Sequence, residues 1–235
     1  MHNESAGILE NSRQSFRDAI DHGFGIELDL QLSKDGEAMV FHDYGLSRLT
    51  EGKGPVRQRT AEELRAIPLK SGDETIPDLP EILSLINGQV PLLIELKDQD
   101  GIFGPDVGPL EERTAELLRD YNGEVAVMSF NPHAVIAMRK YAPELPRGLT
   151  TDAFKITGWP TTPRARAREL RQIPDFDRAG AGFISHSRKY LDTKPVARLK
   201  GFGVPVLTWT VRSPEEEAKA RQIADNITFE GYIPA

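Results

Sequence analysis

Apolar and polar positions along the chain follow two alternating patterns. Short apolar runs, such as residues 91–96 and 204–211, have the length and composition of β-strands. Between such runs lie segments such as residues 11–22, in which apolar side chains recur with the spacing of one face of a helix. This alternation predicts an α/β fold.

Seven segments are predicted to be strands, and most are near-continuous apolar runs, as expected for strands buried on both faces. They are residues 25–30, 38–41, 91–96, 124–129, 147–150, 182–185 and 204–211. The predicted helices are residues 11–22, 60–67, 80–86, 110–121, 133–141, 164–172, 195–200 and 214–223, the second opened by a capping box of Thr60 and Glu63.

The order of these segments indicates one architecture. A (β/α)8 TIM barrel has eight strands and about 250 residues. The pattern therefore predicts such a barrel, of which this chain shows seven candidate strands. No linker or repeat divides residues 1–235, so we expect a single barrel domain.

Composition and charge exclude several classes of function. The formal net charge is −7, which disfavours non-specific binding to nucleic acid or an anionic membrane surface. The absence of cysteine excludes a thiolate nucleophile, cysteine-ligated zinc and disulfides. No apolar run approaches the roughly 20 residues of a membrane-spanning helix, and the N-terminal residues do not resemble a signal peptide. We therefore expect a cytoplasmic protein with no membrane insertion.

Acidic residues interrupt two of the apolar strands. Glu27 and Asp29 are two positions apart and so lie on one face of their strand, while Glu95 lies on another strand. An ionised carboxylate in a strand core is strongly unfavourable unless it is paired or bound to a metal ion. Three converging carboxylates suit Mg²⁺ or Ca²⁺. The alternative places Glu27 and Asp29 on a solvated strand face and pairs Glu95 with Lys97.

Other reactive residues lie at or near strand ends. His42 follows a strand, where it could act as a general acid or base. Lys97 shares a strand face with Glu95 and could hold a phosphate oxygen, the alternative being a surface lysine. Trp209 is either a core residue or a ligand contact, and His186 faces either the site or a structural hydrogen bond.

Several segments of the chain resemble the signature of the glycerophosphodiester phosphodiesterase family. They match the family's Pro-Glu-Asn, Ile-Glu-x-Asp, Lys-Asp-Gly and His-Asp elements, and later its Ile-Pro-Thr-Leu, Ile-Glu-Ile-Lys and Trp-Thr-Val elements. The segments are Leu9-Glu10-Asn11, Ile26-Glu27-Leu28-Asp29, Lys34-Asp35-Gly36, Val40-Phe41-His42-Asp43, Ile76-Pro77-Asp78-Leu79, Ile94-Glu95-Leu96-Lys97 and Thr208-Trp209-Thr210-Val211. The resemblance covers most of the chain in the correct order.

The resemblance implies a TIM barrel in which Glu27, Asp29 and Glu95 bind one divalent metal ion, Mg²⁺ or Ca²⁺. It implies hydrolysis of a small-molecule glycerophosphodiester to an alcohol and sn-glycerol 3-phosphate. The metal ion would stabilise the developing negative charge.

Four further residues receive roles from the same resemblance. His42 would be the general acid that protonates the leaving alkoxide, and Lys97 would bind the phosphate. Trp209 would contact the substrate, and Glu10 would support the site. The alcohol released depends on loop shapes that the pattern does not specify.

One element of the family's signature, the His-Arg-Gly that ends its first strand, has no counterpart. The resemblance therefore implies a (β/α)8 TIM barrel with its first strand missing or incomplete in this chain. Met1-His2 resembles the two residues that follow this motif in one subgroup. We therefore expect that the translation start was placed too late, and that a chain beginning at Met1 would expose strand edges and be nearly inactive. The connection at residues 31–37 is also too short for a parallel crossover.

Two other functions compete with this interpretation. A sphingomyelinase D-like phosphodiesterase or a phosphoinositide-cleaving lyase of the same superfamily would use the same acids. An N-terminally truncated, inactive barrel would bind phosphodiesters or a partner without turnover. Against the inactive barrel stands the joint presence of five residues that no structural role requires together, namely Glu27, Asp29, Glu95, Lys97 and His42.

Overall fold

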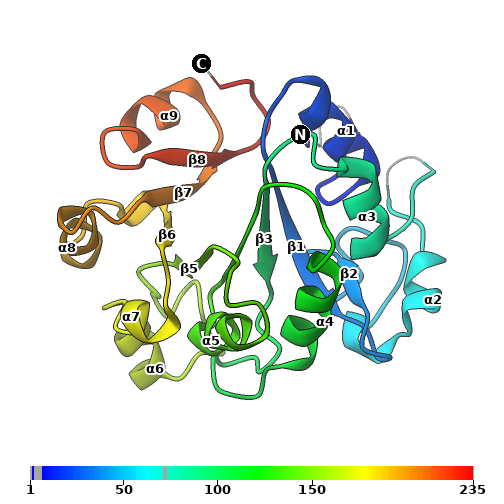
Figure 1. Ribbon diagram of the computed structural model, residues 1–235, viewed down its shortest axis with the longest axis horizontal. Coiled ribbons are helices and arrows are strands. Elements are labelled where there is room, and N and C mark those ends of the chain that lie inside the picture. The colour runs from blue at the N-terminus through cyan, green and yellow to red at the C-terminus, as the bar shows by residue number, and fades with distance from the viewer. Residues whose placement is uncertain (1, 3–6, 71–72, 235) are drawn as a thin grey trace. The chain divides into compact units, whose positions relative to one another are not determined.

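The computed structural model describes residues 2, 7–70 and 73–234. The chain forms two compact units. Unit 1 consists of Met1–Lys97 and Gly108–Ala126, and unit 2 consists of Asp98–Val107 and Val127–Ala235. In both units strands alternate with helices along the chain (Figure 1), so the predicted α/β class is confirmed.

Among the described residues, the strands that lie wholly in unit 1 are β1 (Ile26–Leu32), β2 (Ala38–Val40) and β3 (Leu92–Leu96). β1 lies between the other two and pairs in parallel with β3, with Asp29 opposite Glu95. β2 pairs antiparallel with the end of β1, with Leu30 opposite Val40. The sheet order β2-β1-β3 therefore sets two acid-bearing strands side by side.

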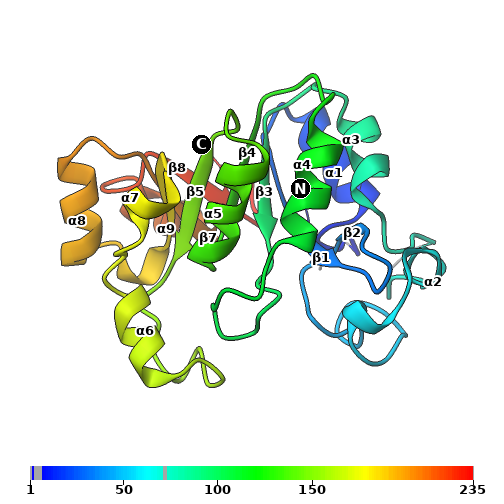
Figure 2. The ribbon, with the colours of Figure 1, turned by 60° about the horizontal axis from the view of Figure 1, so that its bottom comes forward.

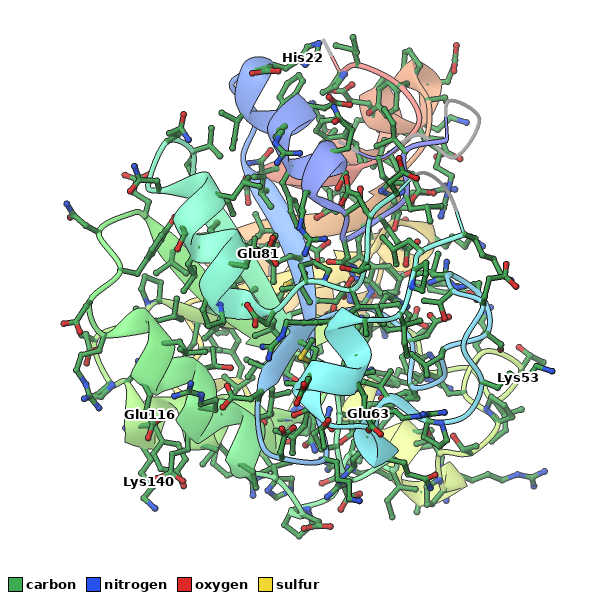
Figure 3. All side chains as sticks on the ribbon, turned by 90° about the vertical axis from the view of Figure 1, so that its right-hand side faces the viewer. His22, Lys53, Glu63, Glu81, Glu116 and Lys140 are labelled. Carbon is green, nitrogen blue, oxygen red and sulfur yellow. The ribbon has the colours of Figure 1, made fainter. Side chains whose placement is uncertain are left out.

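Side chains cap three of the described helices of unit 1, namely Ser12 for α1 (Arg13–Asp21), Thr60 for α2 (Ala61–Arg65) and Asp78 for α3 (Leu79–Ile86). Unit 1 also contains η2 (Val56–Gln58) and α4 (Pro109–Leu118). The predicted capping box of Thr60 and Glu63 is confirmed at the start of α2, and Glu63 is labelled in Figure 3. Helices α1 and α3 lie side by side (Figure 2), and Arg13 of α1 forms an ion pair with Glu81 of α3.

Unit 2 contains a sheet of parallel strands. β4 (Val125–Ser129), β5 (Arg147–Thr151), β6 (Phe183–Ser187), β7 (Val206–Val211) and β8 (Asn226–Phe229) pair in this order. The helices are α5 (Pro132–Tyr141), α6 (Arg164–Leu170), α7 (Phe176–Ala179), η3 (Arg188–Tyr190), α8 (Lys194–Gly201) and α9 (Pro214–Ala220). Buried aliphatic side chains such as Leu149, Ile184 and Val206 form its core.

Two strand predictions are corrected by the structure. The segment at residues 38–41 was counted among the barrel strands, but β2 is antiparallel to β1. An antiparallel pair needs only a tight turn, which explains the short connection at residues 31–37 and the left-handed φ of +88° at Gly36. β8 was not predicted. The seven predicted strands therefore include one antiparallel strand that was counted as a barrel strand, and they omit one parallel strand.

Within the described residues, no helix is both long enough and apolar enough to cross a membrane.

Candidate metal and phosphodiester site

Two neighbouring strands of unit 1 bring three acidic side chains together. Glu27 and Asp29 share one face of β1, and the parallel register sets Asp29 beside Glu95 on β3. One carboxylate oxygen from each of the three lies within 4.8 Å of the others. Asp29 and Glu95 are buried and Glu27 is half-buried, so the solvated-face alternative is wrong for Asp29.

Lys97 follows β3 and forms two short ion pairs within this cluster. Its Nζ lies 2.6 Å from Oδ1 of Asp29 and 2.5 Å from Oε1 of Glu95. The side chain is only 11% exposed, so the surface-lysine alternative is wrong. Burial would lower the pKa of the Lys97 ammonium, but the two carboxylates outweigh burial and raise it, which keeps Lys97 cationic.

Burial and neighbouring charges shift the pKa values of the three acids in different directions. Burial, then the charges of Asp29 and Glu95, raise the pKa of Glu27 well above its ordinary value. Burial also raises the pKa of Glu95, with Lys97 opposing it. For Asp29 burial acts in the same direction, but Lys97 and His42 outweigh it and lower the pKa.

The donor set fits a divalent metal ion. Three carboxylates and one ammonium leave two uncompensated negative charges when all are ionised. Among the described residues, none donates a hydrogen bond or a salt bridge to the carboxylate of Glu27. Hard oxygen ligands of this kind suit Mg²⁺ or Ca²⁺. Glu27, Asp29 and Glu95 could therefore hold one such ion.

Asn11 orients Asp29 within this cluster. Its Nδ2 donates to Oδ2 of Asp29 at 2.8 Å, and its Oδ1 accepts from the backbone N–H of Asp29 at 3.1 Å. Asn11 has a left-handed φ of 55°, which asparagine tolerates better than most residues. Sequence reasoning matched Asn11 to a family motif but gave it no role, since the contact spans 18 positions.

His42 follows β2 and is held by the next residue. Its Nδ1 lies 2.7 Å from Oδ1 of Asp43, and its side chain is 48% exposed. Burial would lower the pKa of His42, but the hydrogen bond to Asp43 outweighs burial and raises it. The ring is therefore both accessible and more basic than an ordinary histidine.

Arg48 is a second residue that sequence reasoning missed. Its guanidinium contacts the carboxylates of both Asp43 and Glu10. Glu10 lies just before α1, so this contact links the start of the helix to the segment after β2. An arginine 38 positions from its partner gives no local signal in the sequence.

Trp209 and His186 lie in unit 2 and make interior contacts there. Nε1 of Trp209 donates to the carbonyl of Ser185 at 3.0 Å, and its ring packs edge-on against Phe130. These contacts suit a partly buried core residue, and a substrate contact for Trp209 stays a prediction. His186 is buried and hydrogen-bonded to Thr151, in agreement with the structural alternative for this residue.

Solved structures of phosphodiesterases share the fold of this chain. A phosphodiesterase of Oleispira antarctica, solved in complex with the product sn-glycerol-3-phosphate, aligns with a TM-score of 0.79 at 24% identity, covering 98% of this chain and 91% of its own. A glycerophosphodiester phosphodiesterase of Parabacteroides distasonis aligns with a TM-score of 0.75 at 23% identity, covering 95% and 87%. Fold and site together thus define an α/β protein that has the fold of these phosphodiesterases and an acidic cluster that could hold a divalent metal ion.

Sequence comparison identifies the family. The chain is 31% identical over 225 residues to a glycerophosphodiester phosphodiesterase of Caldanaerobacter subterraneus subsp. tengcongensis, covering 91% of this chain and 84% of the relative. The model of the glycerophosphoryl diester phosphodiesterase family matches residues 3–226. The chain belongs to this family.

Proposed function

We propose that this protein hydrolyses a glycerophosphodiester to an alcohol and sn-glycerol 3-phosphate. The observation that carries the proposal is the cluster of Glu27, Asp29 and Glu95 on adjacent parallel strands, with Lys97 beside two of them. A phosphodiester and a divalent cation together match the charge of such a cluster. The family and its relative with sn-glycerol-3-phosphate bound support the same substrate class.

In this proposal the three acids hold one Mg²⁺ or Ca²⁺ ion. The bound ion would supply Lewis-acid stabilisation of the negative charge that develops on the phosphoryl oxygens. Asp29 would be presented in a fixed orientation by Asn11. Glu27, whose carboxylate lacks a donor among the described residues, would gain its counter-charge from the ion.

Lys97 and His42 would act on the substrate. The cationic Lys97 would bind a non-bridging phosphate oxygen. Water would attack phosphorus, the bond from phosphorus to the alcohol oxygen would break, and the leaving alkoxide would take a proton from His42. The proton that the attacking water loses would pass to solvent, from which His42 is reprotonated. Because its pKa is raised, more of His42 carries this proton at neutral pH than in an ordinary histidine.

The remaining assignments belong to the same proposal. Glu10 would support the site through Arg48, and Trp209 would contact the substrate. For the whole chain we propose the (β/α)8 barrel, supported by the alternation of parallel strands with helices and by the solved relatives.

The test is release of sn-glycerol 3-phosphate from diesters of choline, ethanolamine, glycerol and inositol, with Mg²⁺, with Ca²⁺ and with chelator. It compares this chain with one extended at its N-terminus to include the family's His-Arg-Gly segment. We expect metal-dependent release by the extended chain, reduced by about 10²–10⁴-fold in H42Q because a general acid contributes that much. E27Q should lose activity by weakening metal binding. E116Q, which changes an exposed glutamate on α4 (Figure 3), is the matched control and should retain activity.

One outcome would refute the proposed substrate class. If neither chain releases sn-glycerol 3-phosphate from any of the four diesters, although both are folded and bind the metal ion, the proposed reaction is wrong.

A further inference from the structure

Arg48 joins two carboxylates from separate parts of unit 1. Its Nε and Nη2 donate to Oδ2 and Oδ1 of Asp43 at 2.6 and 2.8 Å. Its Nη2 and Nη1 donate to Oε1 and Oε2 of Glu10 at 2.5 and 3.1 Å. These four hydrogen bonds use four of the five N–H groups of a guanidinium. Arg48 therefore has little capacity left to bind a substrate phosphate directly.

Asp43 contacts both Arg48 and His42 and so links the two side chains. Oδ1 of Asp43 accepts from Arg48 and also lies 2.7 Å from Nδ1 of His42. Burial alone would raise the pKa of the Asp43 carboxyl, but the hydrogen bonds from His42 and Arg48 hold it well below its usual range. An ionised carboxylate only accepts hydrogen bonds, so Nδ1 of His42 must carry the proton.

This arrangement fixes which nitrogen of His42 is available for chemistry. With Nδ1 held by Asp43, Nε2 is the atom that exchanges a proton with a ligand. The other charges that act on the ring are Lys97, just after β3, Asp29, within β1, and Glu10, before α1. Of these, Glu10 is bound to Arg48 by two hydrogen bonds.

We propose that Arg48 is a positioning residue that clamps Asp43 against Glu10, and thereby fixes the orientation and the Nδ1–H tautomer of His42. The catalytic consequence rests on the proposed function. The structural consequence, the tautomer of His42, does not. A half-exposed ion pair adds only about 0–1 kcal/mol to stability, so a stabilising role alone would not need two bidentate contacts.

Unit 1 offers a matched control in Arg65. This arginine makes an ion pair with Asp78 at 2.6 Å, and its side chain is 47% exposed, against 44% for Arg48. Arg65 lies on α2 and is not part of the candidate site. The variant R65M therefore removes an arginine of similar exposure without touching His42.

The experiment compares wild type, R48M, R48K and R65M by three measurements. Thermal unfolding reports stability, ¹⁵N NMR of the His42 ring at a pH where it is neutral reports the tautomer, and kinetics separate kcat from KM. The His42 signal among the five histidines is assigned with H42Q.

In wild type and R65M we expect the Nδ1–H tautomer. In R48M we expect a mixture of tautomers and a kcat about 10–100-fold lower with KM little changed, as for other residues that orient site ligands. R48K keeps the charge but cannot hold both carboxylates bidentately, so its defect should be intermediate.

An unchanged His42 tautomer in folded R48M or R48K would overturn the proposal, and so would a failure of both variants to fold. If the tautomer changes as expected but neither this chain nor the chain extended to include the His-Arg-Gly segment is active, the proposed function is contradicted and the positioning role of Arg48 is supported.

Discussion

At the scale of single residues, the site depends on side chains whose partners are far away in the sequence. Asp29 has one oxygen held by Asn11 and the other beside Lys97, so its carboxylate is constrained at both ends. His42 is constrained in the same way by Asp43. Such supporting contacts determine whether a reactive group lies where chemistry requires it.

The contact between Asn11 and Asp29 can be tested by two substitutions. N11A removes both hydrogen bonds and leaves an alanine with left-handed φ, whereas N11G removes the bonds without that strain. We expect N11A to lose about 1–3 kcal/mol of stability and metal affinity to fall about tenfold in both variants. Calorimetric titration with Mg²⁺ and Ca²⁺ measures the affinity. Wild-type affinity in N11G would contradict the orienting role.

His186 predicts a pH dependence of stability. Its pKa is lowered from 6.5 to about 4, chiefly by burial, so the folded state holds the neutral ring. The unfolded chain binds a proton below pH 6.5, so this contribution to stability is present above pH 6.5 and is lost as the pH falls toward 4.

Comparison of wild type with H186Q isolates this contribution. Between pH 7.5 and 4.5, urea unfolding of wild type should lose about 2–3 kcal/mol more than H186Q does. H22Q, which changes an exposed histidine at the end of α1 (Figure 3), is the control. Parallel pH profiles for wild type and H186Q would refute the assignment.

At the scale of elements, strand register decides which side chains meet. The parallel pairing of β1 with β3 places Asp29 opposite Glu95. Because successive side chains of a strand alternate between faces, a slip by one residue would turn one set of acids away from the other. The turn between α3 and β3 fixes where β3 begins, and it contains Gly88 with a left-handed φ of +70°.

Gly88 should tolerate substitution poorly. A Cβ at this position would lie 2.4 Å from the backbone oxygen of Asn122, in addition to the strain of its left-handed φ. We expect G88A to lose about 2 kcal/mol or more in the free energy of unfolding. G36A meets no atom within 4 Å and should lose only about 1 kcal/mol, which is the strain alone. If G88A and G36A lose equal free energies of unfolding in urea, the structure must shift to relieve the contact of residue 88 with the backbone of Asn122.

At the scale of the whole molecule, the candidate metal ligands all belong to unit 1. A ligand that binds only the folded state stabilises it by mass action. Bound metal should therefore report on folding as well as on activity, independently of any substrate.

Mg²⁺ or Ca²⁺ should raise the thermal unfolding temperature. At a concentration about 100 times Kd, the stabilisation is about 2.7 kcal/mol. For a chain of this size we expect a rise in Tm of roughly 5–10 °C, reversed by chelator. E95Q should abolish the shift and E116Q should keep it, as measured by calorimetry. The same shift in E95Q would exclude the three-carboxylate site.

How much the sequence could predict differs between local and long-range features. Glu27, Asp29 and Glu95 were identifiable because acids within apolar strands require compensation. The direction of β2 was predicted wrongly because the same residues would form a strand whether it pairs parallel or antiparallel to β1. The strand β8 was missed because Asn226–Phe229 is short and only partly buried.

The sequence by itself determined the α/β alternation, the strands that carry the acids and the family resemblance, because periodicity and motifs are local properties of the chain. Tertiary structure alone decided the antiparallel direction of β2, the ion pair of Lys97 with Asp29 and the contact of Arg48 with Glu10. The two ion pairs join residues 68 and 38 positions apart, for which no local pattern exists.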